Sequence, residues 1–164
     1  MHASLASAAV DVAAVHCTET YCHPRIPPRK ELSEGHSKCI FCAETSHYRR
    51  LATTHVTSAC CVLELGCSFG DATKILVRRA KHVMGVDNSQ ECLDRAAAVC
   101  SNASNCRFML MDVLANPAQC LEGGRQMVGL GSVVAFVDLG GNRDGAAVIP
   151  ILVLLLKELA PALM

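Results

Sequence analysis

Apolar residues come in short blocks from residue 60 onward, and the blocks alternate between strand-like and helix-like patterns. Four continuous apolar runs predict buried strands at residues 60–65, 82–86, 106–110 and 132–137. Helical spacing predicts helices at residues 44–54, 71–81, 90–100 and 144–159, and a helical turn at 117–121 that Glu122-Gly123-Gly124 ends. Strands that alternate with helices in this way predict an α/β fold.

The predicted strands are apolar along their length, without alternation of apolar and polar residues. Such strands are buried on both faces, which is typical of a parallel sheet covered by helices on either side. Because right-handed crossovers connect parallel strands, we expect a doubly wound, mostly parallel sheet. Ligands of such folds bind at the carboxyl ends of the strands.

The first 44 residues do not continue this pattern. Turn and breaker residues crowd there, at His23-Pro24, Pro27-Pro28 and Gly35, and the hydrophobic periodicity is poor. We therefore expect a loosely folded, Cys- and His-rich extension at residues 1–44, followed by one domain at residues 45–164.

Two pairs of cysteines lie in this extension: Cys17 and Cys22, then Cys39 and Cys42. Four thiolates could hold a zinc ion in a tetrahedral site, which would staple a segment that has little core. The alternative is a leader with incidental cysteines, because the chain holds 11 cysteines in all. The spacing leaves both interpretations open.

Composition restricts the location and the partners of the protein. The chain has 15 basic and 15 acidic residues, so its net charge offers no general attraction to nucleic acid or to an anionic membrane. The longest apolar run, residues 148–156, contains Pro150 and is far shorter than the ~20 residues of a membrane span. An odd number of cysteines without a secretory signal predicts an intracellular, cytoplasmic protein, with organelle targeting left open.

Acidic residues stand at or near the end of each predicted strand. Glu64 lies inside the first strand, Asp71 follows the next turn, and Asp87, Asp112 and Asp138 end the other strands. An aspartate at such a place is often only a turn or capping residue. A buried Glu64, in contrast, is costly unless a ligand cation or backbone N–H groups compensate its charge. The acids together predict a site for a ligand that carries positive charge.

A turn from Gly66 to Gly70, followed by Asp87, suits either a dinucleotide or S-adenosylmethionine. The dinucleotide pattern needs glycine where Ser68 and Asp71 stand, and a carboxylate at a helix N-terminus repels a diphosphate. S-adenosylmethionine has no phosphate and carries an ammonium and a sulfonium group. We expect Asp87 to bind its ribose hydroxyls and Asp112 to accept from its adenine amino group.

Four segments, in this order, resemble the motifs of class I, Rossmann-like S-adenosylmethionine-dependent methyltransferases. They are residues 62–70 (VLELGCSFG), 83–89 (VMGVDNS), 108–113 (FMLMDV) and 134–139 (VAFVDL). The resemblance covers roughly residues 47–164. It implies cofactor contacts by a set of residues at the strand ends: Glu64, Gly66, Cys67, Ser68, Gly70, Asp87, Asn88, Asp112, Val113 and Asp138.

Two features depart from the pattern of that family. Ser68 stands where many members have glycine, although serine is small enough for a close backbone approach. The fourth motif continues into Gly140 and Gly141 and lacks the Asn/Asp-Pro-Pro-aromatic signature of amino methyltransferases. Neither the catalytic residues nor the methyl acceptor can be assigned from the sequence.

The family's sheet normally has seven strands, and the resemblance implies the order 3-2-1-4 for the four predicted here. We expect the fold to be C-terminally incomplete, with an apolar edge on the strand at 132–137 that a partner chain could cover. Three functions follow. The first is a methyltransferase of unknown acceptor, the second a non-catalytic or truncated S-adenosylmethionine-binding or interaction module, and the third and weakest a nicotinamide oxidoreductase.

Overall fold

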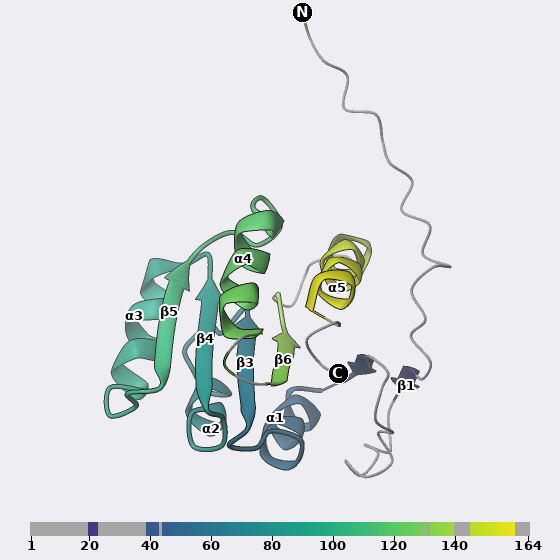
Figure 1. Cartoon of the computed structure of the whole chain (residues 1–164). Helices are drawn as coiled ribbons and strands as arrows, with labels where there is room; N and C mark the ends of the chain where they lie inside the picture. The colour runs from purple at the N-terminus through teal and green to yellow at the C-terminus, as the bar shows by residue number, and fades with distance from the viewer. Residues whose placement is uncertain are drawn as a thin grey trace, which may run out of the picture.

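A computed structural model of the chain describes residues 20–22, 39–42, 44–128, 130, 132–139 and 145–159 (Figure 1). One sheet holds β3 (Cys60–Leu65), β4 (His82–Asp87), β5 (Cys106–Leu110) and β6 (Ser132–Val137), in the order β5-β4-β3-β6. All three pairings in this sheet are parallel. The predicted α/β fold and its strand order, 3-2-1-4, are therefore confirmed.

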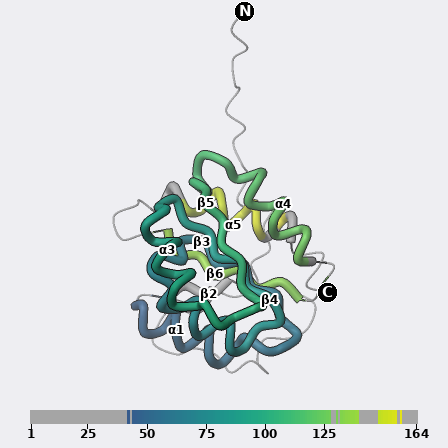
Figure 2. The backbone as a smooth tube through the Cα atoms, turned by 90° about the vertical axis from the view of Figure 1, so that its left-hand side faces the viewer, coloured from purple at the N-terminus to yellow at the C-terminus, as the bar shows by residue number. Residues whose placement is uncertain are grey.

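Parallel strands are joined by crossover connections that usually contain a helix. In this sheet such helices cover both faces. On one face lie α1 (Thr45–Thr54), α2 (Thr73–Leu76) and α3 (Gln90–Val99). On the other face lie α4 (Pro117–Val128) and α5 (Gly145–Leu159) (Figures 1 and 2). No described helix combines the length and the apolar character that a membrane crossing needs.

The central strand β3 is buried from end to end. Successive side chains of a strand point to opposite faces, so β3 contributes to two cores. Cys61, Leu63 and Leu65 pack into the core beneath α4 and α5. Cys60 and Val62 pack into the core beneath α1 and α2. Because both faces of β3 are buried, all of its residues except Glu64 are apolar.

The helix predicted at residues 71–81 is shorter than expected, since α2 covers Thr73–Leu76 and turns follow it. The side-chain amide of Asn105 donates hydrogen bonds to the carbonyls of Val77 and Ala80, each at 3.0 Å. These bonds satisfy backbone acceptors that a regular helix end leaves open. The end of the helix thus depends on a residue that is distant in the sequence.

The helix predicted to stop at Glu122-Gly123-Gly124 continues instead to the end of α4 at Val128. A Cβ atom on Gly123 would lie 3.0 Å from the sulfur of Met84 in β4. Glycine therefore lets α4 approach the sheet closely, and this packing outweighs its low helix propensity.

Two short strands that the sequence did not predict occur within the N-terminal 44 residues. β1 (Thr20–Cys22) and β2 (Cys39–Phe41) pair in parallel. Most of the predicted extension, Cys17 included, lies outside the described residues, so the domain boundary near residue 44 stays a prediction. The remaining predicted elements agree with α1, α3, α5 and the four strands of the main sheet to within a residue or two.

Candidate functional site

The carboxyl ends of the four parallel strands meet at one edge of the sheet (Figure 1). Leu65, the last residue of β3, pairs with Val86 on one side and with Val137 on the other. The aspartates after these neighbours, Asp87 and Asp138, therefore flank the turn that follows β3. The structure brings the predicted strand-end residues together at the place where ligands of such folds bind.

The turn after β3 depends on glycine at two places. Gly66 and Gly70 both have φ of +81°, and Ser68 between them has φ of +47°. A Cβ atom on Gly66 would lie 1.7 Å from the carbonyl oxygen of Asp138, and one on Gly70 would lie 2.9 Å from Cα of Ala96 in α3. The two glycines let the turn fit between the end of β6 and α3.

Asp87 connects this turn to the end of β4. Its Oδ2 accepts a hydrogen bond of 2.9 Å from the backbone N–H of Ser68, and its Oδ1 accepts one of 3.0 Å from that of Ser89. Each carboxylate oxygen has a second lone pair for a further donor. The neighbouring residue, Asn88, is exposed. Asp87 thus has a structural role and the capacity to bind two more hydroxyl groups.

Asp112 closes a turn after β5. Its Oδ1 accepts hydrogen bonds from the backbone N–H groups of Leu114, at 3.0 Å, and Ala115, at 3.3 Å. The side chain of Val113 points away from the sheet edge into the apolar core, where it is 4% exposed. Only the backbone of Val113 is therefore available for the contact predicted for this residue.

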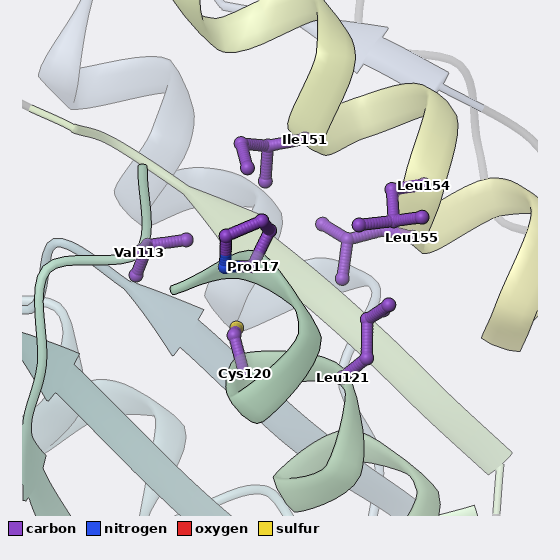
Figure 3. A pocket seen from close by; sticks show the side chains of 7 residues that line it. All are labelled: Val113, Pro117, Cys120, Leu121, Ile151, Leu154 and Leu155. Atoms are coloured by element: carbon purple, nitrogen blue, oxygen red, sulfur yellow. The ribbon is translucent and has the colours of Figure 1, made fainter. Parts of the chain in front are cut away.

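The side chain of Val113 lines an apolar pocket between α4 and α5 (Figure 3). The other lining residues are also apolar or weakly polar: Pro117, Cys120, Leu121, Ile151, Leu154 and Leu155. This pocket offers no charged group to a ligand. It therefore lacks the carboxylates that lie at the ends of the strands.

Glu64 is the most deeply buried acid of the site, with 1% of its surface exposed. Its Oε2 accepts a hydrogen bond of 2.6 Å from the hydroxyl of Thr73 in α2. The sequence predicted a ligand cation or backbone N–H groups as partners, and the described partner is instead this hydroxyl. Burial raises the pKa of Glu64 to about 7, against the lowering effect of the Thr73 hydrogen bond.

Cys67 is buried in the turn, and its backbone N–H donates to the carbonyl of Val86 at 3.1 Å. Burial raises the pKa of its thiol far above the usual range, and the charges of Glu64 and Asp87 add to that rise. The thiol is therefore neutral, and it is not a nucleophile at ordinary pH.

Asp71, which the sequence placed next to the turn, is exposed and paired. Its carboxylate lies 2.7 Å from Nζ of Lys74 and 3.1 Å from the guanidinium of Arg49. The hydrogen bond and the charge of Lys74 hold the pKa of Asp71 below its usual value, with a smaller contribution from Arg49. Two cations of this chain thus balance the charge of Asp71.

Tyr48 of α1 lies next to the site, and the sequence did not predict a role for it. Its ring packs edge-on against Phe136 of β6, with centroids 5.2 Å apart and planes at 88°. Its hydroxyl is buried and has no hydrogen-bond partner among the described residues. The signal in the sequence was a single aromatic hydroxyl on an apolar helix face, which is not specific.

The zinc hypothesis is not settled by these residues. Cys17 lies outside them, and no group of three or more metal-binding side chains occurs within the described parts of the chain. Cys42 has a free thiol, and burial raises its pKa.

Comparison with known proteins supports the assignment of the fold. A precorrin-8w decarboxylase from Methanobacterium thermoautotrophicum has a TM-score of 0.51 at 18% identity, over 74% of this chain and 60% of that chain. A methyltransferase candidate from Streptococcus mutans, solved with S-adenosylhomocysteine, has a TM-score of 0.50 at 11% identity, over 70% and 65% of the two chains. At these identities the likeness shows the fold alone.

A 23S rRNA methyltransferase, ErmE, has 24% identity and a TM-score of 0.38, over 45% of this chain and 31% of that chain. This chain thus spans less than two thirds of the length of each of these three proteins. A search of curated protein sequences gives no match.

The sequence profile of a methyltransferase domain matches residues 62–124. The matched segment runs from β3 to α4 and contains the Gly66 turn, Asp87 and Asp112. Residues 62–124 are therefore similar in sequence to a methyltransferase domain.

Proposed function

We propose that the protein binds S-adenosylmethionine at the carboxyl ends of β3, β4 and β5 and is a methyltransferase. The observation that carries this proposal is the methyltransferase-domain match, which spans the segment that holds the turn and its acids. A second observation supports the same place: the hydrogen bond of 2.9 Å between Ser68 and Asp87 joins the turn to the acid predicted to bind ribose.

The donor set of the site fits this cofactor. Asp87 keeps a lone pair on each carboxylate oxygen for the two ribose hydroxyls, while Asp112 offers its carboxylate to the adenine amino group. Asp138 and the carboxyl group of Glu64 lie next to the turn, where the positive methionine end would lie. When bound, the cofactor supplies a methyl group on a positively charged sulfur.

The turn would contact the cofactor mainly through its backbone, by Gly66, Cys67, Ser68 and Gly70. The positive φ values at Gly66 and Gly70 place this backbone between β6 and α3 without intervening side chains. Asn88 and the backbone of Val113 complete the proposed contacts on the adenosine side.

The alternative is a non-catalytic module that binds S-adenosylmethionine without transferring its methyl group. No acceptor is assigned, and a net charge of zero gives no reason to favour nucleic acid. A methyl-transfer assay with radiolabelled cofactor and pools of small-molecule, peptide and RNA acceptors separates the two. Transfer to any pool supports the enzyme, whereas cofactor binding without transfer to any of them supports the module.

Isothermal calorimetry with S-adenosylmethionine, S-adenosylhomocysteine and NAD tests the proposed binding. Asp87→Ala should weaken the binding of both sulfur compounds about 10- to 100-fold, because two charge-assisted hydrogen bonds are lost. Asp94→Ala is the matched control, since Asp94 is an exposed aspartate of α3 that bonds only Gln90 in the described chain. NAD binding without binding of either sulfur compound would overturn the proposal.

We also propose that a strand from a partner chain covers the outer edge of β6. This edge has no strand beside it in the described part of the chain, and unpaired strand edges attract further strands. Light scattering of the purified chain should then show a dimer or larger species, and a monomer at micromolar concentration would contradict it. An intracellular, cytoplasmic location is a further proposal, supported by the free thiols of the eight cysteines within residues 42–120.

A further inference from the structure

Glu64 is a buried carboxyl group that has no cationic partner among the described residues. It is 1% exposed, and its hydrogen bond to the Thr73 hydroxyl is a neutral one. The charge of Asp138, which has the same sign, raises the pKa of Glu64, and no cation of the described residues lowers it. Ionising such a group costs free energy unless a positive charge comes close.

The elements around Glu64 contribute neutral or acidic groups. These groups are Tyr48 of α1, Thr73 of α2, Cys67 of the turn, Asp138 after β6, Cys100 after α3, and Cys106 of β5. Two cations on the same helices, Arg49 of α1 and Lys74 of α2, pair with the exposed carboxylate of Asp71 instead.

Tyr48 adds a second unsatisfied group to the same face. Its ring packs against Phe136, the residue that pairs with Glu64 across the sheet. Its buried hydroxyl has no hydrogen-bond partner among the described residues. Glu64 and Tyr48 thus place two polar groups without full partners among the described residues beneath the carboxyl ends of the strands. A bound cation would complete such a site.

We propose that Glu64 holds a proton in the ligand-free protein and releases it when a cationic ligand binds over the Gly66 turn. This inference rests on the proposed function, in which the positively charged methionine end of S-adenosylmethionine occupies that place. The carboxyl proton passes to solvent, and the carboxylate that remains faces the positive charge of the ligand. Glu64 is then a specificity-determining residue that favours a cationic ligand over a neutral one.

The position of Glu64 gives the expected size of the effect. Gly66 lies two residue steps along the chain from Glu64, which corresponds to about 7 Å in an extended strand. A unit positive charge at about 7 Å, with an effective dielectric constant of ~20, shifts a proton equilibrium about fiftyfold. Since burial raises the pKa of Glu64 to about 7, the proton should be held at pH 6 without ligand and mostly released with it.

Calorimetry of the whole chain with S-adenosylmethionine at pH 6, in two buffers of different ionisation enthalpy, measures this release. The wild-type protein should release about 0.5 to 1 proton per ligand. Its affinity should therefore increase as pH increases toward 7, by up to about tenfold per pH unit. Glu64→Gln keeps the acceptor oxygen for Thr73 but has no proton to lose, so its release should fall to that of the ligand's own groups.

Two further variants separate Glu64 from its surroundings. Thr73→Val removes the hydrogen bond that lowers the pKa of Glu64, so the midpoint of the affinity–pH curve should move to higher pH. Tyr48→Phe keeps the ring contact with Phe136 and should leave the number of released protons unchanged.

The possible failures are distinguishable. Absence of binding by any sulfur compound would defeat the proposed function itself. Binding by the wild-type protein without proton release at pH 6, or with the same release in Glu64→Gln, would overturn the role of Glu64 and leave the proposed function intact. The wild-type measurement alone decides the matter if Glu64→Gln does not fold.

Discussion

The buried Glu64 makes a quantitative prediction about stability that needs no ligand. In the folded chain burial raises the pKa of this carboxyl from 4.5 to about 7. The folded state thus holds the proton over a pH range in which the unfolded chain has already lost it. A raised pKa of this kind adds stability that is complete below about pH 4.5 and is lost as pH rises through about 7.

The size of the loss follows from the same shift. Of the full shift of about 2.5 pKa units, about 1.8 units take effect between pH 5 and pH 8, which at ~1.4 kcal/mol per unit correspond to about 2.5 kcal/mol. Because other groups also contribute to the pH dependence of stability, the useful quantity is the difference between the wild-type protein and Glu64→Gln. Relative to the wild type, this variant should gain about 2.5 kcal/mol of unfolding free energy between pH 5 and pH 8.

Urea unfolding at pH 5, 6, 7 and 8, followed by circular dichroism, gives these free energies of unfolding. Glu91→Gln serves as the matched control, because Glu91 is an exposed glutamate whose charge pairs with Arg95 on the surface of α3. The control should follow the wild-type curve. The reasoning is refuted if Glu64→Gln also follows the wild-type curve, because Glu64 would then ionise in the folded state as it does in the unfolded chain.

Three other substitutions test the structure around the site. Gly66→Ala should cost more than about 3 kcal/mol in urea unfolding, because its Cβ atom would meet the carbonyl oxygen of Asp138 at 1.7 Å in a backbone with positive φ; a cost below about 1 kcal/mol would contradict the described turn. Ser89→Ala should lose about 1 kcal/mol, since the Ser89 hydroxyl caps α3 by accepting from the Cys92 N–H at 3.3 Å, and an unchanged midpoint would remove that role. Asp71→Asn should change stability by less than about 1 kcal/mol despite two ion pairs, because both are exposed to solvent; a larger loss would show that the pairs hold α1 and α2 together.

The main sheet could be predicted from the sequence because its signals are local. Continuous apolar runs predict the strands, and helical spacing predicts the start of α3 at residue 90, where the structure has it. The order of the strands followed from the resemblance to the methyltransferase family together with the handedness of crossovers.

The errors have a common physical cause, which is contact between residues far apart in the sequence. Asn105 ends α2 early through two carbonyls, and the close approach to Met84 lets α4 continue through Gly123. The pairing of β1 with β2 joins short segments that have no periodic signal of their own. Local sequence patterns do not predict contacts between distant residues.

The site was predictable in its position but not in its interactions. The acids at the strand ends could be read from their spacing. In contrast, the hydroxyl partner of Glu64, the ion pairs of Asp71 and the unsatisfied Tyr48 hydroxyl depend on how α1 and α2 pack over β3. These contacts determine which carboxyl groups are ionised, and therefore how the site would bind a cationic ligand.

An NMR titration of the ¹⁵N-labelled chain with S-adenosylhomocysteine tests the central claim most directly, because it reports where the ligand binds. We expect saturable shifts of the backbone amides of Gly66, Ser68, Asn88 and Val113, which follow three neighbouring strands at one edge of the sheet. Amides on the opposite edge, such as that of His82 at the start of β4, should stay unchanged. Saturable shifts confined to the opposite edge, or no shifts at millimolar ligand, would contradict the claim.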